Sequence, residues 1–166
     1  MNIETTSGIL ATCGDAPIEH YAPGTVLFDE GKSSGRLLIL VEGEVEVRRG
    51  GTTVAMVADP GAVFGEMSAL LGLPHTATVL ARSPVTVRAP MDAGLFLREH
   101  PEVAFHLARL LAQRLNAATS YLVDIKRQYD GRSDHLGMVG EVLEVLTVQQ
   151  GRGFSPGPER SDDPRM

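Results

Sequence analysis

The chain has 166 residues, of which 43% are hydrophobic and 22% are charged, a balance typical of one globular domain with appendages. Its formal net charge of −6 argues against a surface built to bind nucleic acid, and no apolar run approaches the roughly 20 residues that cross a bilayer. The first residues lack a basic stretch followed by an apolar one, so we expect no signal peptide and a cytoplasmic protein. Cys13 is the only cysteine, which excludes an internal disulfide.

Short β-like segments, separated by glycines and Pro-Gly pairs, run from Tyr21 to Pro90. The apolar run Arg36–Val41 predicts a strand that is buried on both faces. About eight short strands are expected, as in small barrels and sandwiches. They include Val26–Phe28, Arg36–Val41, Glu44–Val47, Thr52–Ala58, Thr76–Ala81 and Val85–Arg88.

A short amphipathic helix, Glu66–Leu71, is predicted directly after Gly65 and ends at Gly72. A helix start has unpaired N–H groups and a partial positive charge, so it can hold a phosphate, and Gly65 allows close approach. Glu66 would repel that phosphate unless it accepts a hydrogen bond from another part of the ligand, such as a sugar hydroxyl. The alternative, which spacing alone favours, is that Glu66 only stabilises the helix dipole, by about 0.3–1 kcal/mol.

Two further helices are predicted after the strands. Asp92 can cap a short helix that reaches about His100, and Pro101 suits the first position of a longer one. One apolar stripe of the longer helix, from Val103 to Leu110, is expected to pack on the β domain. A second stripe is a heptad seam that fits a homodimer, and the alternative covers it with a later helix of the same chain. The seam comprises Ala104, Ala108, Leu111, Leu115, Ala118, Leu122, Ile125 and Tyr129.

The last part of the chain has weaker signals. Asp130-Gly131 is expected to end the long helix, and Ser133 can cap another that Gly137 and Gly140 weaken by about 1 kcal/mol each. The remainder is rich in glycine, proline and charge, which predicts disorder. The expected organisation is an N-terminal segment (1–20), a core domain with the long helix (21–130), an additional helix (131–149) and a disordered tail (150–166).

Four segments resemble, in order, the cyclic nucleotide-binding domain of catabolite activators, regulatory subunits of cAMP-dependent kinase and cyclic-nucleotide-gated channels. They read "YAPGTVLFDEG", "LLILVEGEVEV", "DPGAVFGEMSALLGLP" and "ATV", and the resemblance runs from Tyr21 to about Leu115. It implies a mainly β fold with flanking α helices. That fold is a double-stranded β-helix, or jelly-roll-like β-roll, with a short phosphate-binding-cassette helix and a long C-terminal helix.

The resemblance also implies a binding site for cAMP or cGMP, without a cofactor or a metal. Glu66 matches the carboxylate that accepts from the ribose 2′-hydroxyl, and Gly65 with the helix amides would meet the cyclic phosphate. Thr76 matches a small residue that can bind phosphate and, in some members, favours guanine. The implied ligand-binding residues are Phe64, Gly65, Glu66, Met67, Ser68, His75, Thr76 and Ala77, with possible base contacts from Thr119 and Ser120.

The departure from the family pattern is His75, which stands where the family normally has arginine. Arginine is always charged and can meet two phosphate oxygens, whereas histidine offers one N–H and titrates near pH 6.5, about its reference pKa. Three interpretations follow. His75 binds phosphate in a pH-dependent way, Arg36 or Arg82 replaces the arginine, or the pocket has lost nucleotide binding.

Other functions fit the sequence less well. A cupin-like enzyme needs closely spaced histidines, and His75 has no second ligand nearby. A transcription factor of the catabolite activator type would continue into a helix-turn-helix with a basic recognition helix. We therefore expect a non-enzymatic, stand-alone, homodimeric sensor that signals to an unidentified downstream protein. The competing hypothesis is a ligand-free interaction module that uses the same long helix.

Overall fold

The computed structural model describes residues 3–128, 139–140 and 142. The chain divides into two compact units, residues 1–109 and 110–166, and each is described by itself. Helix α4 runs across the boundary between them. In chain order the elements are α1 (Ile3–Thr12), β1 (Ile18–Tyr21), β2 (Val26–Phe28), β3 (Leu38–Glu42), β4 (Val45–Arg49), β5 (Thr52–Val57), β6 (Val63–Phe64), α2 (Glu66–Leu71), β7 (Thr78–Ala81), β8 (Val85–Arg88), α3 (Ala93–Glu99) and α4 (Pro101–Gln128).

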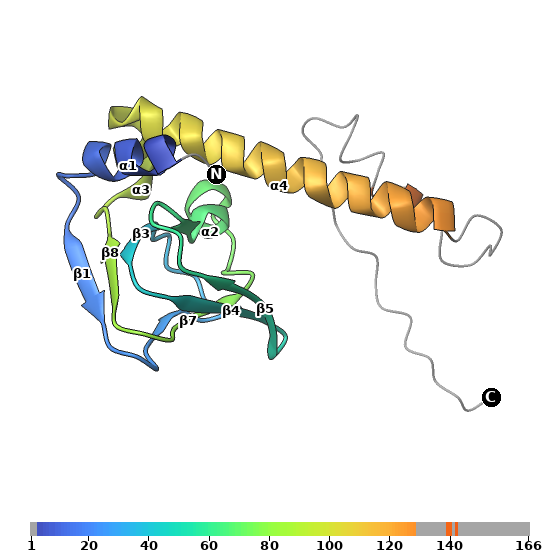
Figure 1. The fold of residues 1–166 in the computed structure, drawn as a ribbon, viewed down its shortest axis with the longest axis horizontal. Coiled ribbons are helices and arrows are strands. Elements are labelled where there is room, and N and C mark those ends of the chain that lie inside the picture. Colours follow the sequence, from blue (N-terminus) through green and yellow to red (C-terminus); the bar gives the residue numbers. More distant parts are fainter. Residues whose placement is uncertain (1–2, 129–138, 141, 143–166) are drawn as a thin grey trace. The chain divides into compact units, whose positions relative to one another are not determined.

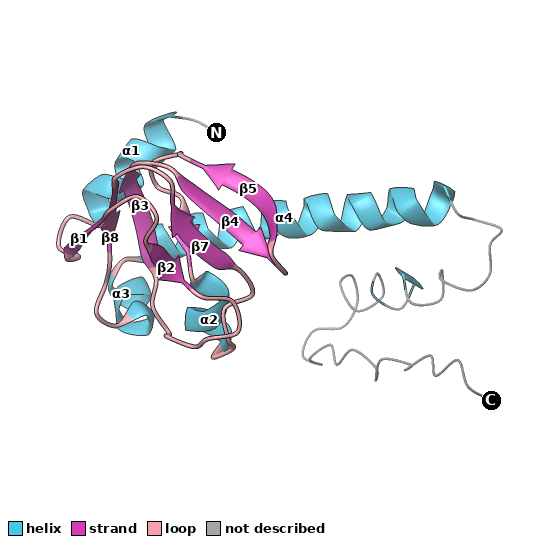
Figure 2. Cartoon of the chain, turned by 90° about the horizontal axis from the view of Figure 1, so that it is seen from below, coloured by secondary structure: helices cyan, strands magenta, loops and turns pink. Residues whose placement is uncertain are grey.

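The first unit is built on two antiparallel four-stranded sheets, with strand orders β1-β8-β3-β6 and β2-β7-β4-β5 (Figures 1 and 2). Their facing side chains form the hydrophobic core of the roll. The predicted fold class, mainly β with flanking helices and a long C-terminal helix, is confirmed. The core comprises Leu27, Phe28, Leu38, Leu40, Val45, Phe64, Val79, Ala81, Val85, Val87 and Ala89.

Strand β3 is buried on both faces, as its continuous apolar sequence predicts. Leu38 and Leu40 point into the core of the roll, whereas Leu37 and Ile39 are equally buried outside that cluster. Apolar residues from the helices are buried as well, among them Ile9, Val103 and Leu107, and so is Cys13, which directly follows α1. The predicted packing of the first apolar stripe of the long helix on its own domain therefore holds for Val103 and Leu107.

The helix boundaries follow the local sequence signals. Helix α2 spans the predicted residues and is flanked by Gly65 and Gly72, both with positive φ. Asp92 caps α3, because its carboxylate accepts a hydrogen bond of 2.8 Å from the backbone N–H of Leu95. Helix α4 begins at Pro101, the expected position.

Three features differ from the sequence prediction. The first strand begins at Ile18 rather than at Tyr21, because it pairs with β8 over four residues. Helix α1 and the two-residue strand β6 were not predicted, since each depends on packing or pairing more than on a local pattern. Strand β7 begins at Thr78 rather than at Thr76, because the backbone of His75 pairs with the β2–β3 loop instead.

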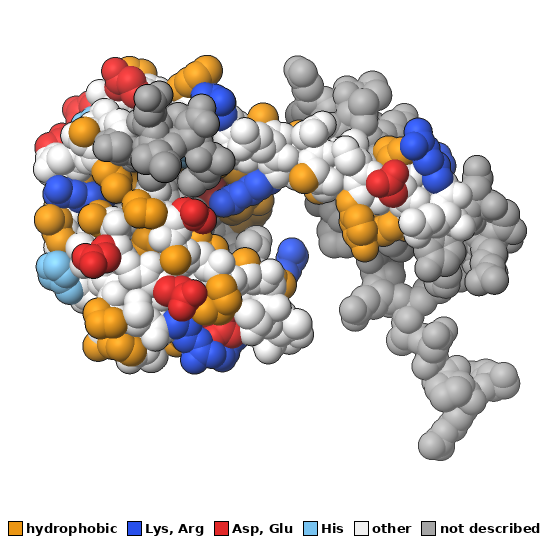
Figure 3. All heavy atoms as spheres, viewed as in Figure 1, with side chains coloured by type: hydrophobic (Ala, Val, Ile, Leu, Met, Phe, Trp, Pro, Cys, Tyr) orange, Lys and Arg blue, Asp and Glu red, His pale blue; other side chains and the backbone are white. Residues whose placement is uncertain are grey.

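Within the second unit, α4 continues to Gln128, and residues 139–140 and 142 are helical. The predicted stop at Asp130-Gly131, the seam residue Tyr129 and the tail lie outside the described residues. In the part of the chain that the structure describes, no helix is long and apolar enough to span a bilayer. Figure 3 shows acidic and basic side chains interspersed on the visible face of the molecule rather than gathered by sign.

Candidate functional site

Gly65 joins β6 to α2 in a conformation that a larger residue cannot adopt without strain. Its φ is +82°, in the left-handed region. A Cβ atom at this position would lie 2.3 Å from the carbonyl oxygen of Arg36 and 2.8 Å from the ring of Phe28. Backbone conformation and close packing therefore both require glycine at the start of this helix.

His75 lies after α2 and is fixed at both its backbone and its ring. Its N–H donates to the carbonyl of Lys32 and its carbonyl accepts from the N–H of Gly31, each at 2.8 Å. The imidazole stacks on Phe28, with ring centroids 4.2 Å apart, and its Nε2 lies 2.7 Å from the hydroxyl of Ser34. The side chain is only 6% exposed. These contacts join the predicted phosphate-binding cassette, Phe64–Ala77, to the β2–β3 loop.

Phe28 contacts both ends of the cassette, at Gly65 and at His75. One part of its ring lies against the backbone at Gly65, and its face stacks on His75. The sequence prediction of the site included neither Phe28 nor Ser34. A stacking partner from β2 and a hydroxyl from the following loop leave no local signature near residue 75, so spacing did not reveal them.

The other predicted cassette residues have varied environments. Glu66 and Ser68 are buried, at 8% and 3% exposure, although both are polar. Met67 on the same helix is exposed, and Phe64 belongs to the core of the roll. The structure therefore places Phe64 mainly in packing. Thr76 is exposed and Ala77 is half-buried.

Both arginines proposed as replacements for the family's arginine are held in ion pairs. Arg36 donates to Glu19 at 2.5 Å, and this contact is the main reason that the pKa of the Glu19 carboxyl is below its usual range. Arg82 pairs with Glu46. Because a guanidinium has five N–H donors, an ion pair alone does not decide between these arginines and His75 as the phosphate contact, and all three stay predictions.

The electrostatic state of His75 follows from its burial. Burial lowers the pKa of His75 below the ordinary histidine value, because an imidazolium loses hydration in the protein interior. The free chain therefore carries a neutral imidazole here at neutral pH. A neutral ring offers one N–H donor and one acceptor, so it binds an anion less strongly than an arginine fork.

The possible base contacts lie in the second unit. Thr119 is half-buried and Ser120 is exposed on α4. The described residues of the heptad seam on the same helix, Ala104 to Ile125, are partly or largely exposed, as Leu115 shows with 45%. The roles of these residues as base contacts and as a dimer seam stay predictions.

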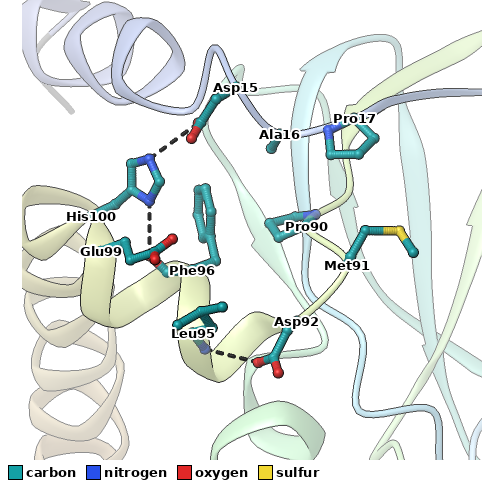
Figure 4. Close-up of a pocket in the computed structure, with 10 residues that line it drawn as sticks. All are labelled: Asp15, Ala16, Pro17, Pro90, Met91, Asp92, Leu95, Phe96, Glu99 and His100. Atoms are coloured by element: carbon teal, nitrogen blue, oxygen red, sulfur yellow. Dashed lines mark hydrogen bonds and ion pairs between the residues drawn. The ribbon is translucent and has the colours of Figure 1, made fainter.

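A pocket of about 190 Å³ lies elsewhere in the first unit, between the α1–β1 loop and α3 (Figure 4). None of the predicted site residues lines it. His100 stands at its edge, with Nδ1 2.9 Å from the carbonyl oxygen of Phe96 and Nε2 3.1 Å from Asp15 (Figure 4). Both partners accept hydrogen bonds, so the ring makes both contacts together only when both nitrogens carry a proton. These contacts tie the N-terminal segment to the end of α3.

Comparison with known proteins agrees with this geometry. Residues 18–90, which include both sheets, α2 and His75, match the model of the cyclic nucleotide-binding domain family. This region belongs to that family. Its regulatory domains share the β-roll and the flanking helices described above.

Individual relatives come from proteins of different kinds. A CRP-like cAMP-activated global transcriptional regulator of Mycobacterium tuberculosis is 30% identical over 111 residues, 63% of this chain and 50% of the relative. An uncharacterized ABC transporter ATP-binding protein from the same species is 35% identical over 88 residues, 51% of this chain and 27% of the relative. The chain thus spans half or less of these relatives. The crystal structure of the Thermus thermophilus catabolite activator protein matches with a TM-score of 0.60 and 30% identity, over 75% of this chain and 60% of that one.

Proposed function

We propose that the chain binds a cyclic mononucleotide, cAMP or cGMP, and acts as a non-enzymatic regulatory module. The observation that carries the proposal is the packed cassette, in which Phe28 contacts both Gly65 and His75 within a domain of the cyclic nucleotide-binding family. A TM-score of 0.60 to a catabolite activator protein supports the same function.

In this proposal Glu66 accepts a hydrogen bond from the ribose 2′-hydroxyl, and Gly65 and Ser68 lie near the cyclic phosphate. His75 and Thr76 would face the phosphate from the other end of the segment. Thr119 and Ser120 would contact the base. A buried carboxylate such as Glu66 is stabilised by a hydroxyl donor, which favours a sugar over a second anion as its neighbour.

Homodimerisation through α4 belongs to the same proposal. Its seam residues are apolar yet partly or largely exposed, and a second copy of the helix would cover them by knobs-into-holes packing. If the base contacts and the dimer contacts share one helix, ligand binding can change the helix geometry that a downstream protein reads. The residues proposed for the dimer contact are Ala108, Leu111, Leu115, Ala118, Leu122 and Ile125.

One observation favours a second candidate, a ligand-free interaction module. His75 is neutral, buried and already in contact with Ser34, so the strongest phosphate partner of the family is missing. Losing one partner of a buried charge pair commonly costs about 2–5 kcal/mol. A site weakened by that amount can lose its ligand altogether.

Ligand binding separates the two candidates. The full chain is titrated with cAMP and with cGMP in a thermal-unfolding assay, with 5′-AMP as the control for non-specific nucleotide binding. A ligand at 100 times its dissociation constant should add about 2.7 kcal/mol to the free energy of unfolding. Glu66→Ala should lose most of the shift. If neither cyclic nucleotide raises the melting temperature at millimolar concentration, at both pH 6 and pH 8, the sensor proposal is wrong.

A further inference from the structure

The ring of His75 is oriented before any ligand binds. Stacking on Phe28 sets the plane of the imidazole, and the Ser34 hydroxyl meets Nε2 at 2.7 Å. Two backbone hydrogen bonds to the β2–β3 loop fix the Cα position. The ring is therefore held in one orientation by neighbours on β2 and the β2–β3 loop.

Charged groups on the segments next to His75 make contacts of their own. On the β2–β3 loop, Lys32 contacts Asp29 at 2.6 Å, and Glu30 accepts from a backbone N–H of the β4–β5 turn. Arg36 at the end of that loop is paired with Glu19, and Glu66 begins the neighbouring α2. A phosphate that binds here gains a further positive charge when His75 takes up a proton.

We propose that nucleotide binding at this site is coupled to the uptake of one proton by His75, an inference that rests on the proposed function. A cyclic phosphodiester carries one negative charge that does not titrate near neutral pH. The proton comes from the solvent and binds the unprotonated ring nitrogen. The resulting imidazolium then has two N–H donors, one of which faces the phosphate.

The coupling has a definite sign. In the free chain, burial keeps the pKa of His75 below its usual value, and a bound phosphate raises it. The affinity is constant below the pKa of the free state, falls as pH rises between the free and bound values, and levels off above the bound value. Within that interval the dissociation constant rises by up to about tenfold per pH unit, because one proton is bound per ligand.

Isothermal titration calorimetry with cAMP and cGMP tests the coupling on the full chain. Titrations at pH 5, 6, 7 and 8, each in two buffers with different ionisation enthalpies, give the pH dependence and the number of protons taken up at each pH. We expect tighter binding at low pH and an uptake between zero and one proton.

Two variants identify the titrating group. His75→Arg carries a permanent charge, so it should bind more tightly at pH 8, with a flat pH profile and no proton uptake. Ser34→Ala removes a neutral hydrogen-bond partner and should change the level of affinity while keeping the slope. Binding without proton uptake in the unmodified chain, or an unchanged slope in His75→Arg, would overturn the inference. Absence of binding at every pH in both proteins would instead overturn the proposed function.

Discussion

Replacing Gly65 with alanine tests whether the start of α2 is a close-packed junction or merely a flexible turn. The φ of +82° costs a residue with a Cβ atom about 1–2 kcal/mol. The added Cβ would also lie 2.3 Å from the Arg36 carbonyl oxygen and 2.8–2.9 Å from two ring carbons of Phe28. Overpacking of this kind typically costs a further 1–3 kcal/mol, or about 2–5 kcal/mol in total.

Gly72 at the other end of α2 provides the matched control. Its φ is +67°, but a Cβ atom there meets nothing within 4 Å. Gly72→Ala should therefore lose only the conformational part, about 1–2 kcal/mol. Equilibrium urea unfolding of both variants, compared at equal m values, measures the difference. Equal losses in the two variants would refute the packing argument at Gly65.

Three further predictions concern buried groups. Glu46 accepts hydrogen bonds from Arg48 and Thr53, which hold its pKa at about 2. Its contribution to stability is present at neutral pH and is lost as pH falls from about 4.5 toward 2. In urea unfolding, Glu46→Gln should have a lower free energy of unfolding than the unmodified chain at pH 7, and this free energy should depend less on pH in the acid range. Cys13 is fully buried, and burial raises its pKa to about 11. A thiol reagent should therefore detect no thiol in the folded chain at pH 8 and one thiol in urea. Rapid reaction of the folded chain would contradict the buried placement of Cys13. His106 is buried, its Nε2 has no hydrogen-bond partner among the described residues, and burial lowers its pKa. Because this histidine takes up a proton more readily in the unfolded chain, the free energy of unfolding falls as pH falls below about 6.5. His106→Phe should therefore unfold at a higher urea concentration than the unmodified chain at pH 5, and this gain should shrink at pH 8.

Helices and strands that are determined by residues close by in the chain could be predicted from the sequence. The apolar run of β3, the Asp92 cap, Pro101 at the start of α4 and the glycines that flank α2 each act within a few residues, and each was confirmed. Strand β6 has only two residues and exists because β3 is beside it. A pairing of that kind has no local pattern to detect, which is why the sequence did not predict it.

The same distinction applies to the candidate site. The cassette and the unusual histidine could be identified from the sequence, because glycine, glutamate and histidine stand at positions that the family pattern defines. The surroundings of His75 were not, since Ser34 lies 41 residues earlier and Phe28 belongs to another strand. Whether His75 is charged depends on this burial, so no sequence pattern could have given its protonation state.

The contact with Phe28 also decides which substitution at position 75 is informative. His75→Ala would leave one face of the Phe28 ring uncovered, and that ring lies against Gly65, so a loss of binding could come from disturbed packing. Arginine avoids this ambiguity because its planar guanidinium also stacks on aromatic faces while carrying a permanent charge. His75→Arg therefore changes the titration of the site and keeps the stacked arrangement. A gain in affinity at pH 8 can then be assigned to charge rather than to repacking around Phe28.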